Sequence, residues 1–136
     1  MKKYKFLLVA SNFYPEITLN LLKGAQKYLE INGHKFDIAF TKGSLEIPTK
    51  ISMKLSKSKY DAVVAIGCII KGKTDHYEFI ANAITKTLLE ISIQNKLPVS
   101  NSILTCKNIN QAKERSSVKL NRAKEAVEAA IAVLQD

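Results

Sequence analysis

An almost unbroken apolar run from Ala62 to Ile70 (AVVAIGCII) constrains the fold of this chain more than any other stretch. The run is rich in valine and isoleucine, which is typical of a strand buried on both faces of a parallel sheet. Lys71 to His76 (KGKTDH) are cationic and turn-forming, and an amphipathic helical pattern follows from His76 to Gln94. The sequence therefore predicts a buried strand, a tight loop and then a helix.

The rest of the chain alternates between strand-like and helix-like patterns. Apolar runs predict further strands over residues 4–10, 36–40 and 99–105. Helical spacing predicts helices from Pro15 to the Asn32-Gly33 stop, from Pro48 to about Ser56, from Asn108 to Arg115 and from Asn121 to Leu134. This β-α-β-α order predicts one α/β domain over residues 1–136, a parallel sheet covered by helices on both faces.

Two predictions concern the surface of this domain. His34 directly follows the stop of the first helix, and we expect it on the surface. The helix from Asn121 to Leu134 is apolar nearly all round. Such a helix needs cover on more than one side, which predicts a subunit interface.

Composition limits the location of the protein and the use of its cysteines. No apolar run approaches the roughly 18 residues of a membrane span, and no signal-peptide cleavage pattern follows Met1. We therefore expect a cytoplasmic protein without a membrane partner. Cys68 and Cys106 have neither a disulfide-framework spacing nor the CxxC spacing of a metal site, so we expect two small buried or half-buried side chains and no metal.

The formal net charge of +9 fits either nucleic acid or phosphorylated metabolites as ligands. The lysines are scattered, however, and no series of aromatic residues accompanies the densest group, which is Lys50, Lys54, Lys57 and Lys59. Stacking aromatics are the usual companions of such a patch in nucleic-acid-binding proteins. We therefore expect a solvated helix face here and no nucleic-acid partner.

Three predicted strand ends carry unusual polar loops, with Phe13, Glu46 and the segment from Lys71 to His76. Ligands bind beyond the carboxyl ends of parallel strands, and a helix start there favours an anion such as phosphate. His76 fits a neutral imidazole that accepts a proton, or a structural helix-start residue. Glu46 fits a helix cap or a hydrogen-bond partner for a polyhydroxylated ligand.

The segment from Gly67 to Thr74 (GCIIKGKT) also matches the P-loop pattern. Cys68, Ile69 and Ile70 are too apolar and bulky for a loop that wraps a phosphate. We expect the match to be accidental.

Several motifs occur together and in order along nearly the whole chain. They are Phe13, Ile17-Thr18, Leu22 to Ala25, Gly43 to Pro48, Ala65 to His76, Pro98-Val99, Leu104-Thr105, Gln111 to Arg115 and Asn121 to Ala126. Together they resemble the 6,7-dimethyl-8-ribityllumazine synthase family. The resemblance implies a flavodoxin-like three-layer α/β/α sandwich with a four-stranded parallel sheet.

The resemblance also implies an activity, the penultimate step of riboflavin biosynthesis. Enzymes of the family condense 5-amino-6-(D-ribitylamino)uracil with 3,4-dihydroxy-2-butanone 4-phosphate and release phosphate and water. They use no metal and no organic cofactor. An imine formation and a β-elimination both need proton transfers near neutral pH, for which histidine is suited.

Residue roles follow from the same resemblance. His76 is the expected acid/base residue, and Phe13 is expected to stack on the pyrimidine ring. The remaining expected substrate-binding residues are Ser44, Leu45 and Glu46 around the ribityl chain, Ile69, Ile70 and Lys71 at the pyrimidine edge, Gly72, Lys73, Thr74 and Arg115 at the phosphate, and Asn101 and Arg122. Leu45 and Asn101 stand where the family usually has aromatic residues, and Arg122 replaces a lysine.

The family assembles into pentamers, which in some members form decamers or 60-subunit shells. Active sites lie between neighbours, so the segment with Asn101, Arg115 and Arg122 is expected to come from the adjacent subunit. Riboflavin synthase is a further expected partner.

Three other interpretations remain open from the sequence. The first is a riboflavin synthase of the archaeal type, which joins two lumazines. The second is a shell that binds flavin or lumazine without turnover. The third, a nucleic-acid-binding module, has the least support.

Overall fold

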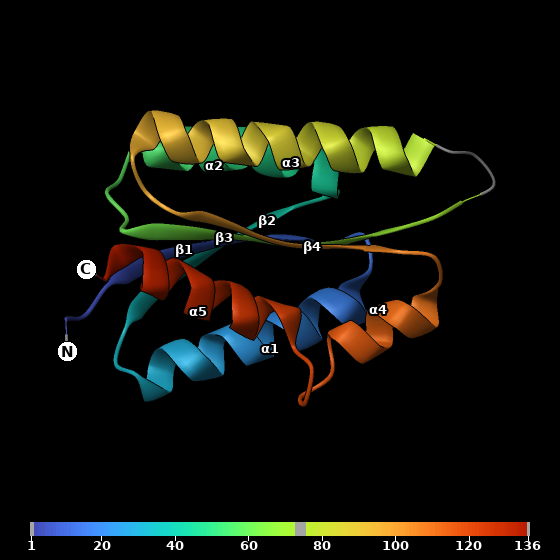
Figure 1. Ribbon diagram of the computed structural model, residues 1–136, viewed down its shortest axis with the longest axis horizontal. Helices are drawn as coiled ribbons and strands as arrows, with labels where there is room; N and C mark the ends of the chain where they lie inside the picture. Colours follow the sequence, from blue (N-terminus) through green and yellow to red (C-terminus); the bar gives the residue numbers. More distant parts are fainter. Residues whose placement is uncertain (1, 73–75, 136) are drawn as a thin grey trace.

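A computed structural model describes residues 2–72 and 76–135. Four strands and five helices alternate along the chain (Figure 1). Their order is β1 (Lys5–Ser11), α1 (Pro15–Ile31), β2 (Lys35–Thr41), the 3-10 turn η1 (Ser44–Glu46), α2 (Ile47–Leu55), β3 (Ala62–Ile70), α3 (His76–Asn95), β4 (Val99–Cys106), α4 (Ile109–Arg115) and α5 (Arg122–Leu134). These elements confirm the predicted α/β order, with boundaries that differ by at most one residue.

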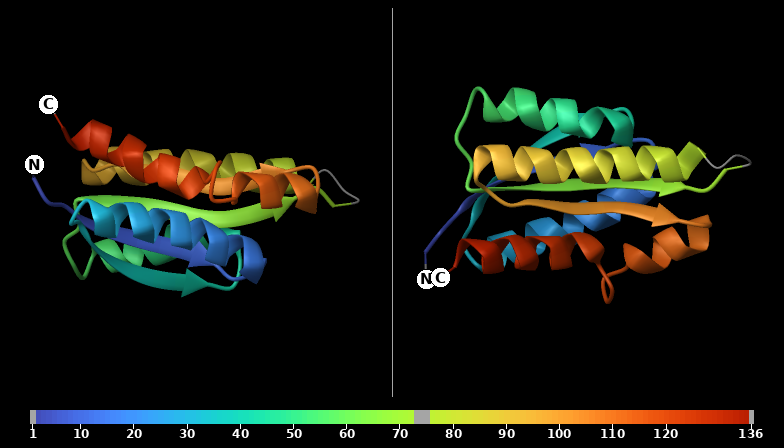
Figure 2. Two further views of the ribbon diagram at one scale, coloured as in Figure 1. Left: turned by 90° about the horizontal axis from the view of Figure 1, so that it is seen from below. Right: turned by 45° about the horizontal axis from the view of Figure 1, so that its top comes forward.

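The four strands form one parallel sheet in the order β2-β1-β3-β4. Helices α2 and α3 cover one face, while α1, α4 and α5 cover the other (Figures 1 and 2). This arrangement confirms the predicted three-layer flavodoxin-like sandwich. All strands run in one direction, so the loops after β1, β2 and β3 all leave the sheet where the strands end. We call this end of the sheet its carboxyl edge.

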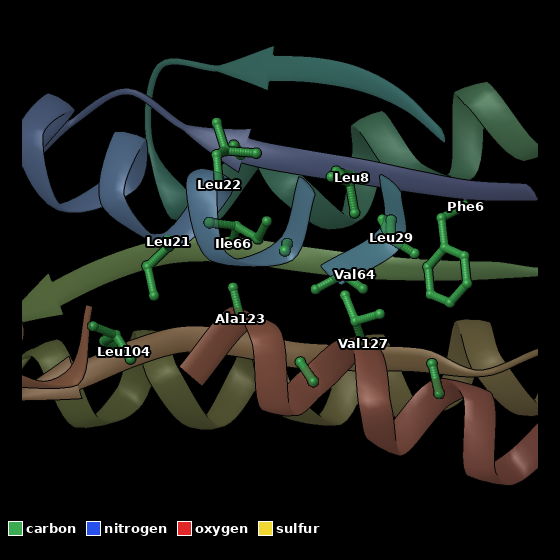
Figure 3. Packing of buried hydrophobic residues seen from close by; sticks show 14 of the residues in the cluster. Phe6, Leu8, Leu21, Leu22, Leu29, Val64, Ile66, Leu104, Ala123 and Val127 are labelled. Carbon is green, nitrogen blue, oxygen red and sulfur yellow. The ribbon is translucent and has the colours of Figure 1, made fainter. Parts of the chain in front are cut away.

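The central strands are buried on both sides, as the apolar run predicted. Ala62, Val64 and Ile66 of β3 pack with Phe6 and Leu8 under α1 and α5 (Figure 3). The alternate residues of the same strands pack in a second core under α2 and α3. Successive side chains of a strand point to opposite faces, so two apolar cores require strands without polar alternation.

Close contact between α1 and α5 depends on Gly24. A Cβ atom at this position would lie 2.2 Å from Cγ of Asn121. Asn121 caps α5 by accepting a hydrogen bond from Lys124 N at 3.0 Å, and its Nδ2 donates to Asn20 O at 2.8 Å. The absence of a side chain at residue 24 therefore lets one asparagine begin α5 and join it to α1.

The inner side of α5 packs against the rest of its own chain. The subunit interface predicted for this helix stays a prediction. Ala123, Ala126, Val127, Ala130 and Ile131 are buried. The outer side carries Val133, which is 70% exposed.

The prediction that His34 lies on the surface is wrong. Its side chain is 5% exposed, and its Nδ1 accepts a hydrogen bond from Tyr4 N at 3.0 Å. The ring stacks on Tyr4, with 5.5 Å between ring centroids. Burial lowers the pKa of His34, and the nearby Lys3 ammonium lowers it further. The turn at Gly33, whose φ is +75°, returns the chain to β2 beside the start of β1, and the imidazole is enclosed there.

Both cysteines are buried, as predicted, and neither forms a disulfide. Burial raises the pKa of the Cys68 thiol to about 12, and Cys106 beside it adds to the shift. Cys68 is therefore a protonated packing residue near neutral pH. Among the helices of residues 2–72 and 76–135, none has the length and apolar character needed to span a bilayer.

Candidate active site

The loops after β1 and β2 meet at the carboxyl edge of the sheet. Asn12 N donates a hydrogen bond to Thr41 O at 2.9 Å, which joins the two strand ends. Phe13 follows directly and leaves 61% of its side chain exposed. Leu45 in the turn after β2 is 59% exposed. This edge of the sheet thus presents two large apolar side chains to solvent.

The turn from Gly43 to Glu46 is held by its own side chains. Thr41 Oγ1 donates to Gly43 O at 2.7 Å, and Gly43 N donates to Glu46 Oε1 at 2.9 Å. Glu46 therefore serves as a cap, one of the two functions that the sequence allowed. A carboxylate has two oxygens with several acceptor positions, so this cap leaves acceptor capacity for the hydroxyl groups of a ligand.

Two buried hydroxyls lie beside Gly67 in β3. A Cβ atom at Gly67 would lie 2.8 Å from Ser44 Oγ and 3.5 Å from Ser11 Oγ. Within the described residues, neither hydroxyl has a hydrogen-bond partner. Ser44 was predicted, but Ser11 was missed. The only sequence signal for Ser11 is a polar residue at the end of an apolar strand.

The end of β3 is strand rather than phosphate-binding loop. Residues 67–70 pair with residues 103–106 of β4, so the P-loop match is accidental, as predicted. Ile69 and Ile70 are half-buried at this strand end, and Lys71 N donates to Cys106 O at 2.9 Å. Lys71 and Gly72 are exposed.

Two of the predicted phosphate-binding residues, Lys73 and Thr74, lie outside the described residues. The described chain resumes at His76, which is the first residue of α3 and is exposed. A helix start has backbone N–H groups without intrahelical partners and a partial positive charge. A helix start that attracts an anionic group of a substrate therefore carries the His76 imidazole, so both can contact one substrate. We call the described part of this region (Phe13, Ser44, Leu45, Glu46, Ile69, Ile70, Lys71, Gly72 and His76) the carboxyl-edge group.

A second group lies along the open edge of β4, which pairs only with β3 on its other side. Asn101, Arg115 and Arg122 line a cavity of about 410 Å³ there. Arg115 Nη1 lies 3.4 Å from both Thr105 O and Cys106 Sγ, and Arg122 Nε lies 3.8 Å from Glu125 Oε2. These long contacts leave most guanidinium donors available to a ligand. We call this cavity the β4-edge groove.

Asn101, at the amino end of this groove, is already engaged with its own chain. Its Nδ2 lies 3.3 Å from Thr85 Oγ1 of α3, and its Oδ1 accepts from Ile103 N at 2.9 Å. An amide held in this way gives the groove a polar wall. An aromatic ring at position 101 would instead offer a surface for stacking.

One chain brings only part of the two groups together: Ile69 pairs with Thr105 of the groove lining, and Lys71 N donates to Cys106 O. Phe13 and residues 44–46 follow β1 and β2, whereas the β4-edge groove lies beyond β3 at the other side of the sheet. Among the described residues, the lining of that groove includes no member of the carboxyl-edge group. In the same part of the chain, no three His, Cys, Asp or Glu side chains gather as metal ligands.

The fold and these two groups define a class of protein, a flavodoxin-like α/β protein with a candidate ligand site at the carboxyl edge of its sheet. A sequence profile of the family described as 6,7-dimethyl-8-ribityllumazine synthase matches residues 3–136. The chain belongs to this family. It is a transferase that condenses 5-amino-6-(D-ribitylamino)uracil with 3,4-dihydroxy-2-butanone 4-phosphate in the penultimate step of riboflavin biosynthesis.

The family match confirms the resemblance identified in the sequence. It also decides against the archaeal type of riboflavin synthase and against a nucleic-acid-binding module. Members of the family act on small molecules and typically assemble into oligomers.

Proposed function

We propose that the carboxyl-edge group of one subunit and the β4-edge groove of its neighbour form one active site. The observation that supports this is that Phe13 and residues 44–46, which follow β1 and β2, lie apart from the β4-edge groove within a single chain. Each group has exposed side chains suited to binding a ligand. Among the described residues, the carboxyl-edge group has an aromatic ring but no guanidinium, and the β4-edge groove has guanidinium groups but no aromatic ring. In a closed ring of identical subunits, one edge of each chain meets the other edge of the next, so both kinds of group can meet at every interface.

The carboxyl-edge group would hold the uracil substrate. Phe13 stacks on the pyrimidine ring, because an exposed aromatic ring gains contact and desolvation from a flat heterocycle. At the ribityl chain the Ser44 hydroxyl donates or accepts a hydrogen bond, the Glu46 carboxylate accepts hydrogen bonds, and Leu45 contacts the chain. Backbone groups of residues 69–71 at the end of β3 bind the pyrimidine edge.

The phosphate of the second substrate would lie between the turn before α3 and the neighbour. Gly72, Lys73 and Thr74 surround the phosphate from one subunit. Arg115 of the adjacent subunit completes its binding, since guanidinium and phosphate form charge-assisted bidentate hydrogen bonds. Asn101 and Arg122 form the neighbour's wall of the site.

His76 would move the protons. The uracil amine attacks the ketone carbon, and loss of water gives an imine. Phosphate then leaves as a neighbouring C–H proton is removed. A neutral imidazole accepts that proton and returns it to a departing oxygen. Holding the two substrates in contact supplies much of the remaining acceleration.

We further propose that residues 1–136 fold as one domain and assemble as a homopentamer in the cytoplasm, alone or as part of a decamer or a 60-subunit shell. Exposed apolar side chains on α3 support an interface there: Phe79 is 73% exposed, Leu89 58% and Ile93 76%. These positions are ten and four residues apart, which places them within about 80° of one another around the helix, so they lie along one side of it. Riboflavin synthase, which uses the lumazine product, is the partner enzyme that we propose.

The experiment that tests this function measures assembly and turnover on the same samples. Native mass spectrometry gives the subunit number, while lumazine fluorescence and free phosphate are followed after both substrates are mixed. Phe79→Asp together with Ile93→Asp is expected to dissociate the oligomer and to abolish turnover, although the exposed positions leave the fold intact. A dissociated chain that retains full activity would place the whole site in one subunit and contradict the proposal.

A further inference from the structure

A second binding surface lies away from the proposed active site. A groove of about 540 Å³ runs between α1, the turn at residues 116–121 and the start of α5. These elements are on the sheet face opposite α2 and α3 (Figures 1 and 2). Among the described residues, none of those that line it belongs to the carboxyl-edge group or to the β4-edge groove. We call it the α1–α5 groove.

The groove is long and follows one side of a helix. Its α1 lining extends from Asn20 to Ile31 with residues at every third or fourth position, which is a single helical face. At 1.5 Å per residue these positions span roughly 16 Å. Gly24 lies midway along this face, where the Asn121 side chain packs against it. A trough of three helical turns fits another helix better than it fits a compact small molecule.

The chemistry of the groove combines exposed apolar surface with one sign of charge. Ile31 is 73% exposed and Val118 is 95% exposed. Tyr28 also lines the groove, with Lys124 Nζ 5.9 Å from its ring centroid. Lys23 and Lys27 are the other charged residues of the lining, and among the described residues it includes no Asp or Glu.

We propose that the α1–α5 groove binds an acidic amphipathic helix of a partner protein. Apolar side chains of that helix cover Tyr28, Ile31 and Val118, which removes apolar surface from water. Its carboxylates lie against Lys23, Lys27 and Lys124, where opposite charges favour the correct partner and speed its association. A second copy of this chain fits less well, because it carries a net charge of +9.

A fluorescent peptide tests the proposal on the full-length protein. The probe is a fluorescein-labelled peptide of about 15 residues, the length at which isolated helices become stable, with leucines on one helical face and glutamates on the other. Its matched control keeps the leucines and replaces each glutamate by lysine. Fluorescence anisotropy is expected to show saturable binding of the acidic peptide and none of the basic one.

Paired variants then locate the binding surface. Lys27→Glu together with Lys124→Glu is expected to weaken binding of the acidic peptide at least about tenfold, because like charges across an interface repel. Lys54→Glu together with Lys57→Glu makes the same charge change at the end of α2, on the other face, and is expected to alter affinity less than about twofold. Val118→Ser removes apolar contact at a position too exposed to affect folding, and is expected to weaken binding about threefold to tenfold.

Several results would overturn the inference. They are no saturable binding up to about 1 mM peptide, equal binding of the basic peptide, or equal losses in the two lysine pairs. A fourth is a change in native mass of the peptide-free protein on Val118→Ser. That change would assign the groove to a contact between copies of this chain rather than to a partner.

Discussion

The carboxyl-edge group and the β4-edge groove differ in the kind of surface that each offers. The first presents exposed Phe13 and Leu45 next to buried hydroxyls, all on backbone fixed by the sheet. The second presents Arg115 and Arg122 along an open strand edge. One surface suits a flat ring and a polyhydroxylated chain, whereas the other suits an anion. The proposed active site joins these two surfaces across a subunit boundary.

The largest effect is expected at the residue that acts on the reaction itself. His76→Ala should lower kcat about a hundredfold while activity remains measurable, because positioned general acid–base catalysis contributes at least that much and substrate proximity is retained. Stopped-flow fluorescence of lumazine formation measures it. His76→Gln is the control, since it keeps a hydrogen-bonding side chain but cannot exchange a proton. An unchanged rate in both variants would remove His76 from the mechanism.

Arg115 tests the anion half of the comparison. Arg115→Ala should lower kcat/KM for the butanone phosphate about thirtyfold, because a charge-assisted hydrogen bond contributes about 2 kcal/mol. Affinity for the uracil substrate should change little. Titration of each substrate at saturating concentration of the other separates the two effects. Arg115→Lys keeps the charge but not the bidentate geometry. Its kcat/KM for the butanone phosphate should fall between those of the wild type and Arg115→Ala. Equal losses for both substrates would contradict the assignment.

Phe13 tests the stacking half. Phe13→Ala should lower the affinity for the uracil substrate about threefold to tenfold, because an aromatic pair contributes about 0.5–1.5 kcal/mol beyond its buried area. Butanone phosphate use should remain close to normal, and the side chain is 61% exposed, so thermal stability should not fall. Phe13→Tyr is the matched control and should retain affinity. A loss that falls instead on the phosphate substrate would reverse the division between the two groups.

His34 provides the smallest effect, in a region remote from both groups. Its folded-state pKa is lowered by burial and by Lys3, so the unfolded chain binds a proton first as the pH falls. Stability is therefore present above the unfolded pKa of about 6.5 and is lost progressively as the pH falls below that value. Urea unfolding at pH 7.5 and pH 5.5 should show a smaller decrease for His34→Asn than for the wild type. Equal decreases would show that other groups cause the acid sensitivity.

Much of the fold could be predicted, because the apolar run at residues 62–70 and the helix spacings are local patterns. The burial of His34 could not, since it depends on pairing between the starts of β1 and β2, which are about 30 residues apart in the chain. Local spacing likewise gave no sign that Glu46 would cap the turn at Gly43 rather than a following helix. Ser11 was missed because its environment arises only where Gly67 of β3 lies beside it.

The sequence predicted the site residues mainly through the family resemblance. Local patterns identified Phe13, Glu46 and the segment at residues 71–76 as unusual loops at strand ends. They gave no reason to select Asn101 or Arg122, which lie on an ordinary strand and at an ordinary helix start. The spatial division of these residues into two groups became visible only with the sheet order.

Complementation between two inactive chains tests most directly whether the active site is shared. His76→Ala and Arg115→Ala chains would be co-expressed with different tags, and the mixed oligomers purified through both tags. If each site uses His76 of one subunit and Arg115 of the next, about a quarter of the interfaces in a random mixture regain both residues. Activity should then rise well above that of either variant alone. If His76 and Arg115 act within one chain, every mixed oligomer will remain as slow as its parents, and the shared site will be contradicted.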